Sequence, residues 1–408
     1  MALAKLTALF NSKARAFVNG RKDLFPKLRK DFEGQKDKII WVHCASLGEF
    51  EQGRPVMEKL KADLPDHKVL LTFFSPSGYE VQKNFTGADH IFYLPFDVPS
   101  HAREFISITR PVLAIFIKYE FWPNFFFELS KQKIHIVSVS SIFREGQIFF
   151  KWYGGFMRST LKAVNYFFVQ NQKSVALLKG IGLSNVSVSG DTRFDRVFEI
   201  TQNQKENLIA KKFKNDQPCW VIGSCWPEDM EVLGHFINMN QGKLKFIIAP
   251  HEISETFIAD IIQSLEVESV RYSQTNADWE NADVLIIDNI GLLSQLYRYG
   301  EFAYVGGGFG KGLHNILEAA CYGIPVFFGN KNFEKFQEAE ELIAQGGAFA
   351  VSGFVELKTN YEMLAGDPEN YLVACQASKN FVEVNLGATE KIFSYCLKLL
   401  KKNEGQGI

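Results

Sequence analysis

The chain has 408 residues, of which 46% are hydrophobic and 22% are charged, so it is long enough for two or three folded domains and has a globular composition. Its 45 Lys and Arg residues nearly balance 46 Asp and Glu residues, and the resulting net charge of -1 argues against general nucleic-acid binding. The sequence contains no run of about 20 apolar residues, so it predicts no membrane-spanning helix. The six Cys residues are scattered and fit no zinc spacing, which is typical of reduced thiols in a cytosolic protein.

Residues 1–38 form a basic segment with apolar residues at roughly helical spacing. Within the first 30 residues, eight Lys or Arg side chains accompany a single acid, Asp23. Such a pattern suits the surface of an anionic membrane, and we predict residues 1–38 as a basic amphipathic, membrane-associating segment. The alternative, which the pattern fits equally well, is an amphipathic helix packed on the body of the protein.

From residue 39 onward, apolar runs alternate with segments of helical character. Continuous Val, Ile and Phe runs, without strict alternation, are typical of parallel strands whose sheet is covered on both faces. The first series of predicted strands comprises residues 39–44, 69–74, 90–96, 112–118, 134–140, 166–170 and 186–190. The second series comprises residues 219–224, 244–250, 283–288, 301–308 and 325–330.

This alternation predicts an α/β protein with two doubly wound, Rossmann-like lobes that face a central cleft. We expect a first lobe at 39–200, a polar linker at 201–217, a second lobe at 218–375 and a carboxyl-terminal helix at 376–408. Ligands of such sheets bind at the carboxyl ends of the strands. The functional site is therefore expected where strand ends of the two lobes meet.

The strongest motif lies at 305–329, where a glycine-rich turn follows a predicted strand and leads into a helix. Gly307 and its neighbours let a ligand approach the backbone, and free N–H groups at a helix start attract phosphate. His314 and Asn315 are candidates for hydrogen bonds to the ligand, and Glu318 for bonds from ribose hydroxyls. The pattern favours nucleotide binding, although the spacing is not that of a Walker motif. The alternative is a tight strand–helix turn without a ligand.

A second motif, at 41–56, places Glu49 at or near the start of a helix that follows a strand. A carboxylate in this position lies beside the positive end of the helix dipole and is a candidate general base toward a hydroxyl. The alternative is a helix-terminal charge of minor energetic value.

A third motif, at 117–129, places Glu120 at a strand end among aromatic residues, where it is a candidate site carboxylate. The aromatic run that follows it has no strict helical period. It either lines a lipid or sugar pocket or forms the start of a buried helix.

Weaker signals occur at other strand ends. Gly223 and Ser224 offer backbone N–H groups to a phosphate, and His251 is a candidate contact to the phosphate or the base. Arg193, near the linker, is a candidate phosphate or carboxylate contact. Each of these is also compatible with an ordinary loop.

Together, the motifs identify a family. The segments WVHCASLGEFEQGRP, LPFDVP, KYEFWPN, GDTRFDRV and VGGGFGKGLHNILEAACYGIPV, in this order and spacing, resemble the 3-deoxy-D-manno-octulosonic acid (Kdo) transferases of lipopolysaccharide synthesis. The resemblance extends from about residue 39 to 400. It implies a two-lobed glycosyltransferase of the GT-B type that moves Kdo from CMP-Kdo to the tetraacylated lipid A precursor, lipid IVA, and inverts the anomeric centre.

The resemblance also implies roles for individual residues. The family's general base falls on Glu49, and a second active-site carboxylate falls on Glu120. The family's CMP-binding positions fall on Gly223, Ser224, Pro250, His251, Gly307, His314, Asn315 and Glu318. The chain departs from the family where Ala249 precedes Pro250 and His251, where Leu313 precedes His314, and where Ala319 follows Glu318.

Cofactor, partners and location follow from the same resemblance. No metal or other cofactor is expected, since a single phosphate leaves with CMP. The expected partners are the CMP-Kdo donor, the lipid A precursor and the inner-leaflet surface, with no nucleic acid, and the protein is expected to be peripheral on the cytoplasmic face of the inner membrane. The alternative is another GT-B nucleotide-sugar enzyme, of the lipid A disaccharide synthase or UDP-sugar epimerase type.

Overall fold

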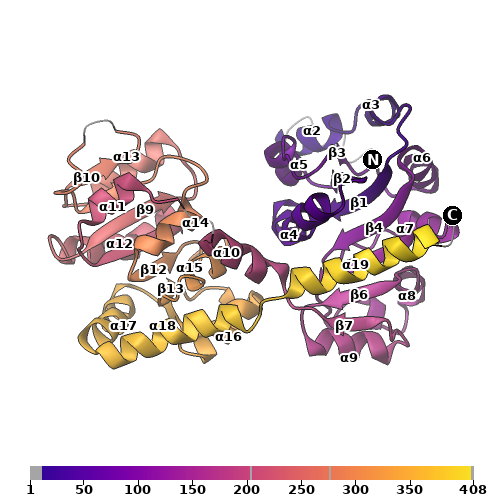
Figure 1. Cartoon of the computed structure of the whole chain (residues 1–408). Coiled ribbons are helices and arrows are strands. Elements are labelled where there is room, and N and C mark those ends of the chain that lie inside the picture. The colour runs from indigo at the N-terminus through magenta and orange to yellow at the C-terminus, as the bar shows by residue number, and fades with distance from the viewer. Residues whose placement is uncertain (1–11, 203–204, 275–276, 406–408) are drawn as a thin grey trace. The chain divides into compact units, whose positions relative to one another are not determined.

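A computed structural model describes residues 12–202, 205–274 and 277–405 of the chain (Figure 1). The chain divides into two compact units. The amino-terminal unit comprises Met1–Arg196 and Leu386–Ile408, and the carboxyl-terminal unit comprises Val197–Asn385. Each unit contains a seven-stranded sheet whose paired strands are all parallel.

The sheet of the amino-terminal unit has the strand order β3-β2-β1-β4-β5-β6-β7. Its strands are β1 (Lys38–Cys44), β2 (His67–Phe73), β3 (His90–Tyr93), β4 (Pro111–Ile117), β5 (His135–Ser141), β6 (Tyr166–Val169) and β7 (Val186–Val188). The order reverses between β1 and β4, and this reversal makes the carboxyl ends of these two strands a topological switch point.

Helices connect these strands, and the chain end returns to the same unit. They are α2 (Ser12–Asn19), α3 (Leu24–Asp31), α4 (Leu47–Asp63), α5 (Pro76–Gln82), α6 (Pro99–Thr109), α7 (Pro123–Lys131), η1 (Ile148–Phe150), α8 (Gly155–Lys162), α9 (Gln172–Gly180), α10 (Thr192–Gln202) and α19 (Ala388–Gly405). Proline begins α5, α6 and α7, where its missing N–H removes no helical hydrogen bond. The predicted segment 376–408 thus contains the end of one helix and all of a second, α19, which packs on the sheet of the amino-terminal unit through Ile392 and Cys396.

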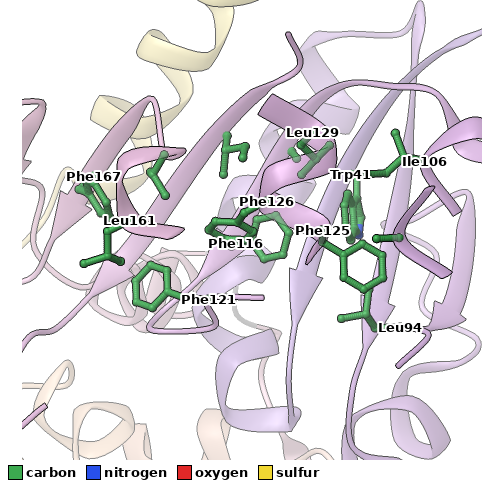
Figure 2. Packing of buried hydrophobic residues seen from close by; sticks show 14 of the residues in the cluster. Trp41, Leu94, Ile106, Phe116, Phe121, Phe125, Phe126, Leu129, Leu161 and Phe167 are labelled. Carbon is green, nitrogen blue, oxygen red and sulfur yellow. The ribbon is translucent and has the colours of Figure 1, made fainter. Parts of the chain in front are cut away.

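The unusual phenylalanine content is explained largely by the core of this unit. Figure 2 shows Phe116, Phe125 and Phe126 packed near Trp41 on one face of the sheet. Phe125 and Phe126 are fully buried. The prediction that the aromatic run lines a ligand pocket is therefore wrong for these two residues, which begin a buried helix because the sheet face beneath them needs an apolar cover.

The described part of the basic amino-terminal segment packs on the body of the protein. Leu24 and Leu28 are buried in the core, and Arg21 donates hydrogen bonds to the carbonyl oxygens of Phe74 at 2.6 Å and Leu94 at 3.0 Å. The packed-helix alternative is thus confirmed for α3. Residues 1–11 of the predicted segment lie outside the described residues, and membrane association of the segment stays a prediction.

The sheet of the carboxyl-terminal unit has the order β10-β11-β9-β8-β12-β13-β14. Its strands are β8 (Cys219–Cys225), β9 (Lys245–Pro250), β10 (Ser269–Arg271), β11 (Val284–Ile286), β12 (Phe302–Val305), β13 (Val326–Gly329) and β14 (Ala348–Val351). Its helices are α11 (Leu208–Lys214), α12 (Pro227–Met239), α13 (Glu255–Ser264), α14 (Leu293–Leu296), η2 (Tyr297–Tyr299), α15 (Leu317–Ala320), η3 (Phe333–Lys335), α16 (Gln337–Ala344), α17 (Phe354–Gly366) and α18 (Pro368–Glu383). The segment 201–217, predicted as a linker, contains the short helix α11.

Every strand predicted from the sequence is present, and two further strands, β10 and β14, were not predicted. These two edge strands have three and four residues and carry no long apolar run. In the part of the chain that the structure describes, no helix has both the length and the apolar character needed to cross a bilayer.

Candidate active site

Two strand ends of the amino-terminal unit bring together the predicted carboxylates. β1 ends at Cys44 and leads into α4, whose first turn contains Glu49, and the neighbouring strand β4 ends at Ile117, shortly before Glu120. Both carboxylates therefore lie at the switch point of this sheet, where ligands of doubly wound proteins bind.

Glu49 is held by the start of its own helix. One of its oxygens, Oε2, accepts hydrogen bonds from the backbone N–H of Ser46 at 3.1 Å and from the Ser46 hydroxyl, so the two residues form a capping box. The other oxygen, Oε1, lies 3.9 Å from Nζ of Lys118. The side chain retains 13% exposure. This arrangement fixes the carboxylate and leaves Oε1 as the oxygen that a proton donor can approach.

The backbone beside Glu120 is in an unusual conformation. Lys118 has a φ of 62°, in the left-handed region, and its carbonyl accepts a hydrogen bond of 2.5 Å from the Ser141 hydroxyl. Burial, followed by the negative charge of Glu49, raises the pKa of Glu120 to about 7. One carboxyl group that changes protonation near neutral pH thus lies close to a second carboxylate, a pattern typical of functional sites.

We expect Glu120→Gln to change the pH dependence of stability. The folded protein holds the Glu120 proton up to about pH 7, whereas the unfolded chain releases it near 4.5, so the wild type loses free energy of unfolding as the pH rises between these values. The glutamine has no charge to bury. The melting temperature of Glu120→Gln should match that of the wild type at pH 5 and exceed it at pH 8. The difference at pH 8 should correspond to about 1–3 kcal/mol in the free energy of unfolding. If the variant and the wild type melt at the same temperature at both pH values, the pKa of Glu120 is not raised.

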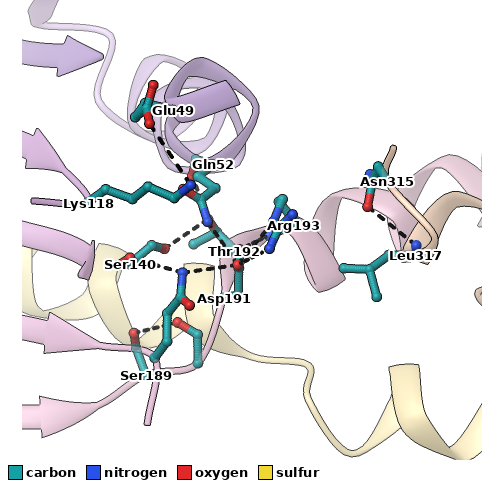
Figure 3. A network of polar contacts seen from close by, with 12 residues as sticks. Glu49, Gln52, Lys118, Ser140, Ser189, Asp191, Thr192, Arg193, Asn315 and Leu317 are labelled. Atoms are coloured by element: carbon teal, nitrogen blue, oxygen red, sulfur yellow. Dashed lines mark hydrogen bonds and ion pairs between the residues drawn. The ribbon is translucent and has the colours of Figure 1, made fainter. Parts of the chain in front are cut away.

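Arg193 lies in a buried polar network of the amino-terminal unit (Figure 3). Its Nε and Nη2 donate to Oδ2 of Asp191 at 3.0 and 2.8 Å, and the same oxygen accepts from Gln52 Nε2 at 2.8 Å and Gln170 Nε2 at 3.1 Å. Burial alone would raise the pKa of Asp191, but Arg193 and these donors hold it below its ordinary value. These contacts give Arg193 a structural role, and its predicted contact to the ligand stays a prediction.

Removal of this guanidinium should destabilise the protein. Arg193→Met leaves the carboxylate of Asp191 buried without its cation, and we expect a loss of about 3 kcal/mol, seen as a lower urea midpoint. The double variant with Asp191→Asn should recover part of this loss because the buried charge is gone. If Arg193→Met unfolds like the wild type and only binds CMP more weakly, the structural role is wrong.

The glycine-rich turn of the carboxyl-terminal unit is shaped by its own backbone. Gly307 has a φ of 89°, and its carbonyl accepts from the N–H groups of Gly310 at 3.2 Å and Gly312 at 3.0 Å. A Cβ at Gly307 would overlap the Gly312 carbonyl oxygen. Glycine is therefore required for the turn itself, because the Gly312 carbonyl oxygen fills the space that a side chain would take.

Two predicted histidines meet beside this turn, together with a tryptophan that sequence reasoning missed. The rings of His251 and His314 lie 4.4 Å apart, and Trp226 stacks on His251 at 4.3 Å. Trp226 Nε1 donates to His314 Nε2 at 3.0 Å. Burial, followed by the nearby His251, lowers the pKa of His314 to about 4. His314 is therefore neutral at pH 7 and, with Nε2 accepting, carries its proton on Nδ1.

Asp229, which sequence reasoning also missed, connects the start of α12 to the glycine turn. Its Oδ2 accepts from the N–H groups of Trp226 and Gly307, both at 2.9 Å, and its Oδ1 accepts from the Tyr304 hydroxyl at 2.9 Å. The residue is fully buried, and burial raises its pKa. The pattern Trp226-Pro227-x-Asp229, directly after a predicted strand, was the available signal, because an acid at the third helical position caps a helix start.

The other predicted residues of this unit occupy strand ends and the helix start. Gly223 lies within β8, where a Cβ would overlap the Tyr297 hydroxyl, and Ser224 follows it with a φ of 51°. Pro250 ends β9 and is buried. Asn315 donates to Glu318 Oε1 at 3.2 Å, and its own Oδ1 accepts from the N–H of Leu317. Packing against Tyr297 thus requires glycine at position 223, which lies in a strand and not in an ordinary loop, whereas Ser224 has a strained backbone of the kind found at binding sites.

Comparison with known proteins shows which family the chain resembles. Residues 20–196 match a family model described as 3-deoxy-D-manno-octulosonic-acid transferase (kdotransferase). The 3-deoxy-D-manno-octulosonic acid transferase of Aquifex aeolicus is 29% identical over 327 residues, covering 78% of this chain and 84% of the relative. The 3-deoxy-D-manno-octulosonic acid transferase of Haemophilus influenzae is 26% identical over 379 residues, which cover 89% of this chain and 88% of the relative. The chain is similar to these transferases over most of its length, and the predicted resemblance to the Kdo transferases is thereby confirmed.

Solved structures show the same fold at low sequence identity. The UDP-GlcNAc 2-epimerase from Neisseria meningitidis, bound to UDP-GlcNAc, superposes with a TM-score of 0.61 at 17% identity and covers 88% of this chain and 100% of its own. The MurG of Acinetobacter baumannii superposes with a TM-score of 0.57 at 10% identity. The superposition covers 89% of this chain and 99% of the MurG chain. The predicted GT-B fold with two parallel α/β sheets is thereby confirmed.

Proposed function

We propose that this protein transfers Kdo from CMP-Kdo to the tetraacylated lipid A precursor, lipid IVA, at the cytoplasmic face of the inner membrane. One observation carries the proposal: the chain aligns over most of its length with curated Kdo transferases. The two carboxylates at the switch point of the first sheet and the aromatic rings beside the glycine turn of the second support it.

In this mechanism the amino-terminal unit supplies the base. Oε1 of Glu49 takes the proton of the attacking glucosamine hydroxyl, whose oxygen forms a bond to the anomeric carbon of Kdo. The bond between that carbon and the phosphate oxygen breaks, and CMP leaves with the electron pair. Attack from the face opposite to CMP inverts the anomeric centre. Nζ of Lys118 lies 3.9 Å from Glu49 Oε1, so a cation faces the oxygen that takes the proton.

The carboxyl-terminal unit holds the nucleotide. Gly223, Ser224, Pro250 and Gly307 bring backbone close to the phosphate and the base, and His251 offers a flat ring to the cytosine. Neutral His314 donates a hydrogen bond from Nδ1, and Asn315 and Glu318 hold the ribose hydroxyls. In this proposal these residues bind the donor nucleotide, and no metal or other cofactor takes part in the mechanism.

The choice of donor tests the proposal against the alternative GT-B activities. The protein is incubated with lipid IVA and either CMP-Kdo or UDP-N-acetylglucosamine, and release of the free nucleotide is followed. We expect release of CMP that depends on lipid IVA, and no release of UDP. Release or epimerisation of the UDP-sugar, with CMP-Kdo left unchanged, would contradict the proposal.

A further inference from the structure

An exposed aromatic loop, defined as residues 148–156, stands out on the surface of the amino-terminal unit. Trp152 is 91% exposed, Tyr153 60% and Phe156 64%, and Ile148 is exposed as well. Single exposed apolar residues are ordinary, but here four occur within nine residues, and the rings of Trp152 and Tyr153 are in contact. Phe156 also contacts the exposed Phe127 of α7, with ring centroids 6.1 Å apart, so the apolar surface extends to a second helix.

The aromatic loop is held in place by a single arginine. Arg158, in α8, donates from Nη1 to the carbonyl oxygens of Phe149 at 3.1 Å and Lys151 at 2.6 Å, and from Nη2 to that of Trp152 at 3.5 Å. The backbone beneath the aromatic side chains is therefore fixed from within. Their exposure is a feature of the folded loop, since its anchor lies in the adjacent helix.

The charge around the aromatic loop is positive. Residues 127–165 contain six Lys or Arg residues and two acids, a difference of +4. Arg144 and Lys162 are exposed on either side of the loop, and Lys151 lies within it. Of the two acids, Glu145 is paired with Lys173 at 3.1 Å, and Glu128 accepts from Gln132 at 2.8 Å. Trp and Tyr with basic neighbours are typical of segments at the interface between lipid and water.

We propose that the aromatic loop docks this protein on an anionic bilayer, with Trp152, Tyr153 and Phe156 entering the headgroup region and the surrounding basic side chains binding lipid phosphates. In the sequence, the aromatic loop lies outside the amino-terminal basic segment 1–38. The proposal goes beyond the proposed transferase activity because vesicle binding requires neither donor nor acceptor, and either can fail without the other.

Co-sedimentation of the full chain with vesicles tests the docking surface. Vesicles of phosphatidylglycerol and phosphatidylcholine are compared with phosphatidylcholine alone, both without acceptor. We expect the triple variant W152A/Y153A/F156A to bind the anionic vesicles about tenfold or more weakly than the wild type. Binding of the wild type should also weaken on the neutral vesicles and at high salt.

The matched control is L372A/V373A, which removes two similarly exposed apolar side chains from α18 in the carboxyl-terminal unit. It should bind vesicles like the wild type. Melting temperatures and light scattering are recorded for all variants. Equal vesicle binding by the triple variant and the wild type would overturn the proposal, as would a wild type that binds no vesicles. A triple variant that changes only the oligomeric state would assign the loop to self-association and also overturn it.

Discussion

Glu49→Gln is expected to abolish most transfer while leaving the fold and CMP binding intact. Glutamine also occurs at this position of capping boxes, so its amide oxygen can replace Oε2 in accepting from the Ser46 N–H. It cannot take a proton from the acceptor hydroxyl. Loss of a general base lowers turnover by about 100- to 10,000-fold, measured as CMP release under saturating CMP-Kdo and lipid IVA.

The matched control for this substitution lies on the same helix. Glu58 pairs with Arg54 at 2.8 Å and Arg196 at 3.5 Å, and Glu58→Gln should retain transfer to within about twofold. Melting curves show whether either variant loses stability. If Glu49→Gln turns over like Glu58→Gln, the carboxylate serves the helix start alone and another group is the base.

Asp229→Ala is expected to have the second largest effect, on both stability and nucleotide binding. It removes the acceptor of two backbone N–H groups and of the Tyr304 hydroxyl in a fully buried place. Unsatisfied buried donors of this kind cost about 1–3 kcal/mol each, so we expect a loss of at least about 3 kcal/mol in urea unfolding. Because Gly307 loses its anchor, CMP affinity measured by calorimetry should fall about tenfold or more.

Asp229→Asn separates the hydrogen bonds from the charge. Its amide oxygen can accept from Trp226 and Gly307, and its NH2 group can donate to the Tyr304 hydroxyl. This variant should therefore remain within about 1 kcal/mol of the wild type and bind CMP nearly as well. An alanine variant with wild-type stability and CMP affinity would show that Asp229 does not organise the glycine turn.

The strands were predictable from the sequence to the extent that their side chains are buried. β1, β4, β8 and β9 are continuous apolar runs because both faces of a parallel sheet are covered. Length alone does not explain why the edge strands β10 and β14 were missed, because β11 and β13 are equally short. β10 has Ser269 and Arg271 on either side of its one apolar residue, and the two central residues of β14 are only partly buried. The aromatic residues after Glu120 are equally apolar in a core or in a pocket, and the sheet face beneath them decides between the two.

Site residues were predictable where their role depends on local sequence. Ser46 and Glu49 carry a capping pattern that the sequence displays, and Gly307 follows a strand in a glycine run. The position of Lys118 beside Glu49 was not predictable, because its left-handed backbone depends on contacts with β5. Likewise, the partner that Asp229 finds in Gly307 lies 78 residues away.

Electrostatic pairing was the hardest feature to predict. The sequence predicts Arg193, near the linker, as a phosphate or carboxylate contact, and in the fold it is paired with the carboxylate of Asp191, two residues earlier. A charged residue that the sequence indicates as a ligand contact can thus belong to a buried network instead. Which charged residues are buried depends on the fold, so the sequence alone does not show it.

The mass of the glycolipid product tests the central claim most directly. Lipid IVA is incubated with CMP-Kdo and either the wild type or Glu49→Gln, and the lipid is weighed by mass spectrometry. The account predicts that the wild type adds the mass of one or more Kdo residues and that Glu49→Gln leaves lipid IVA unchanged in the same time. An unmodified lipid with the wild type, or equal product with both proteins, would contradict it.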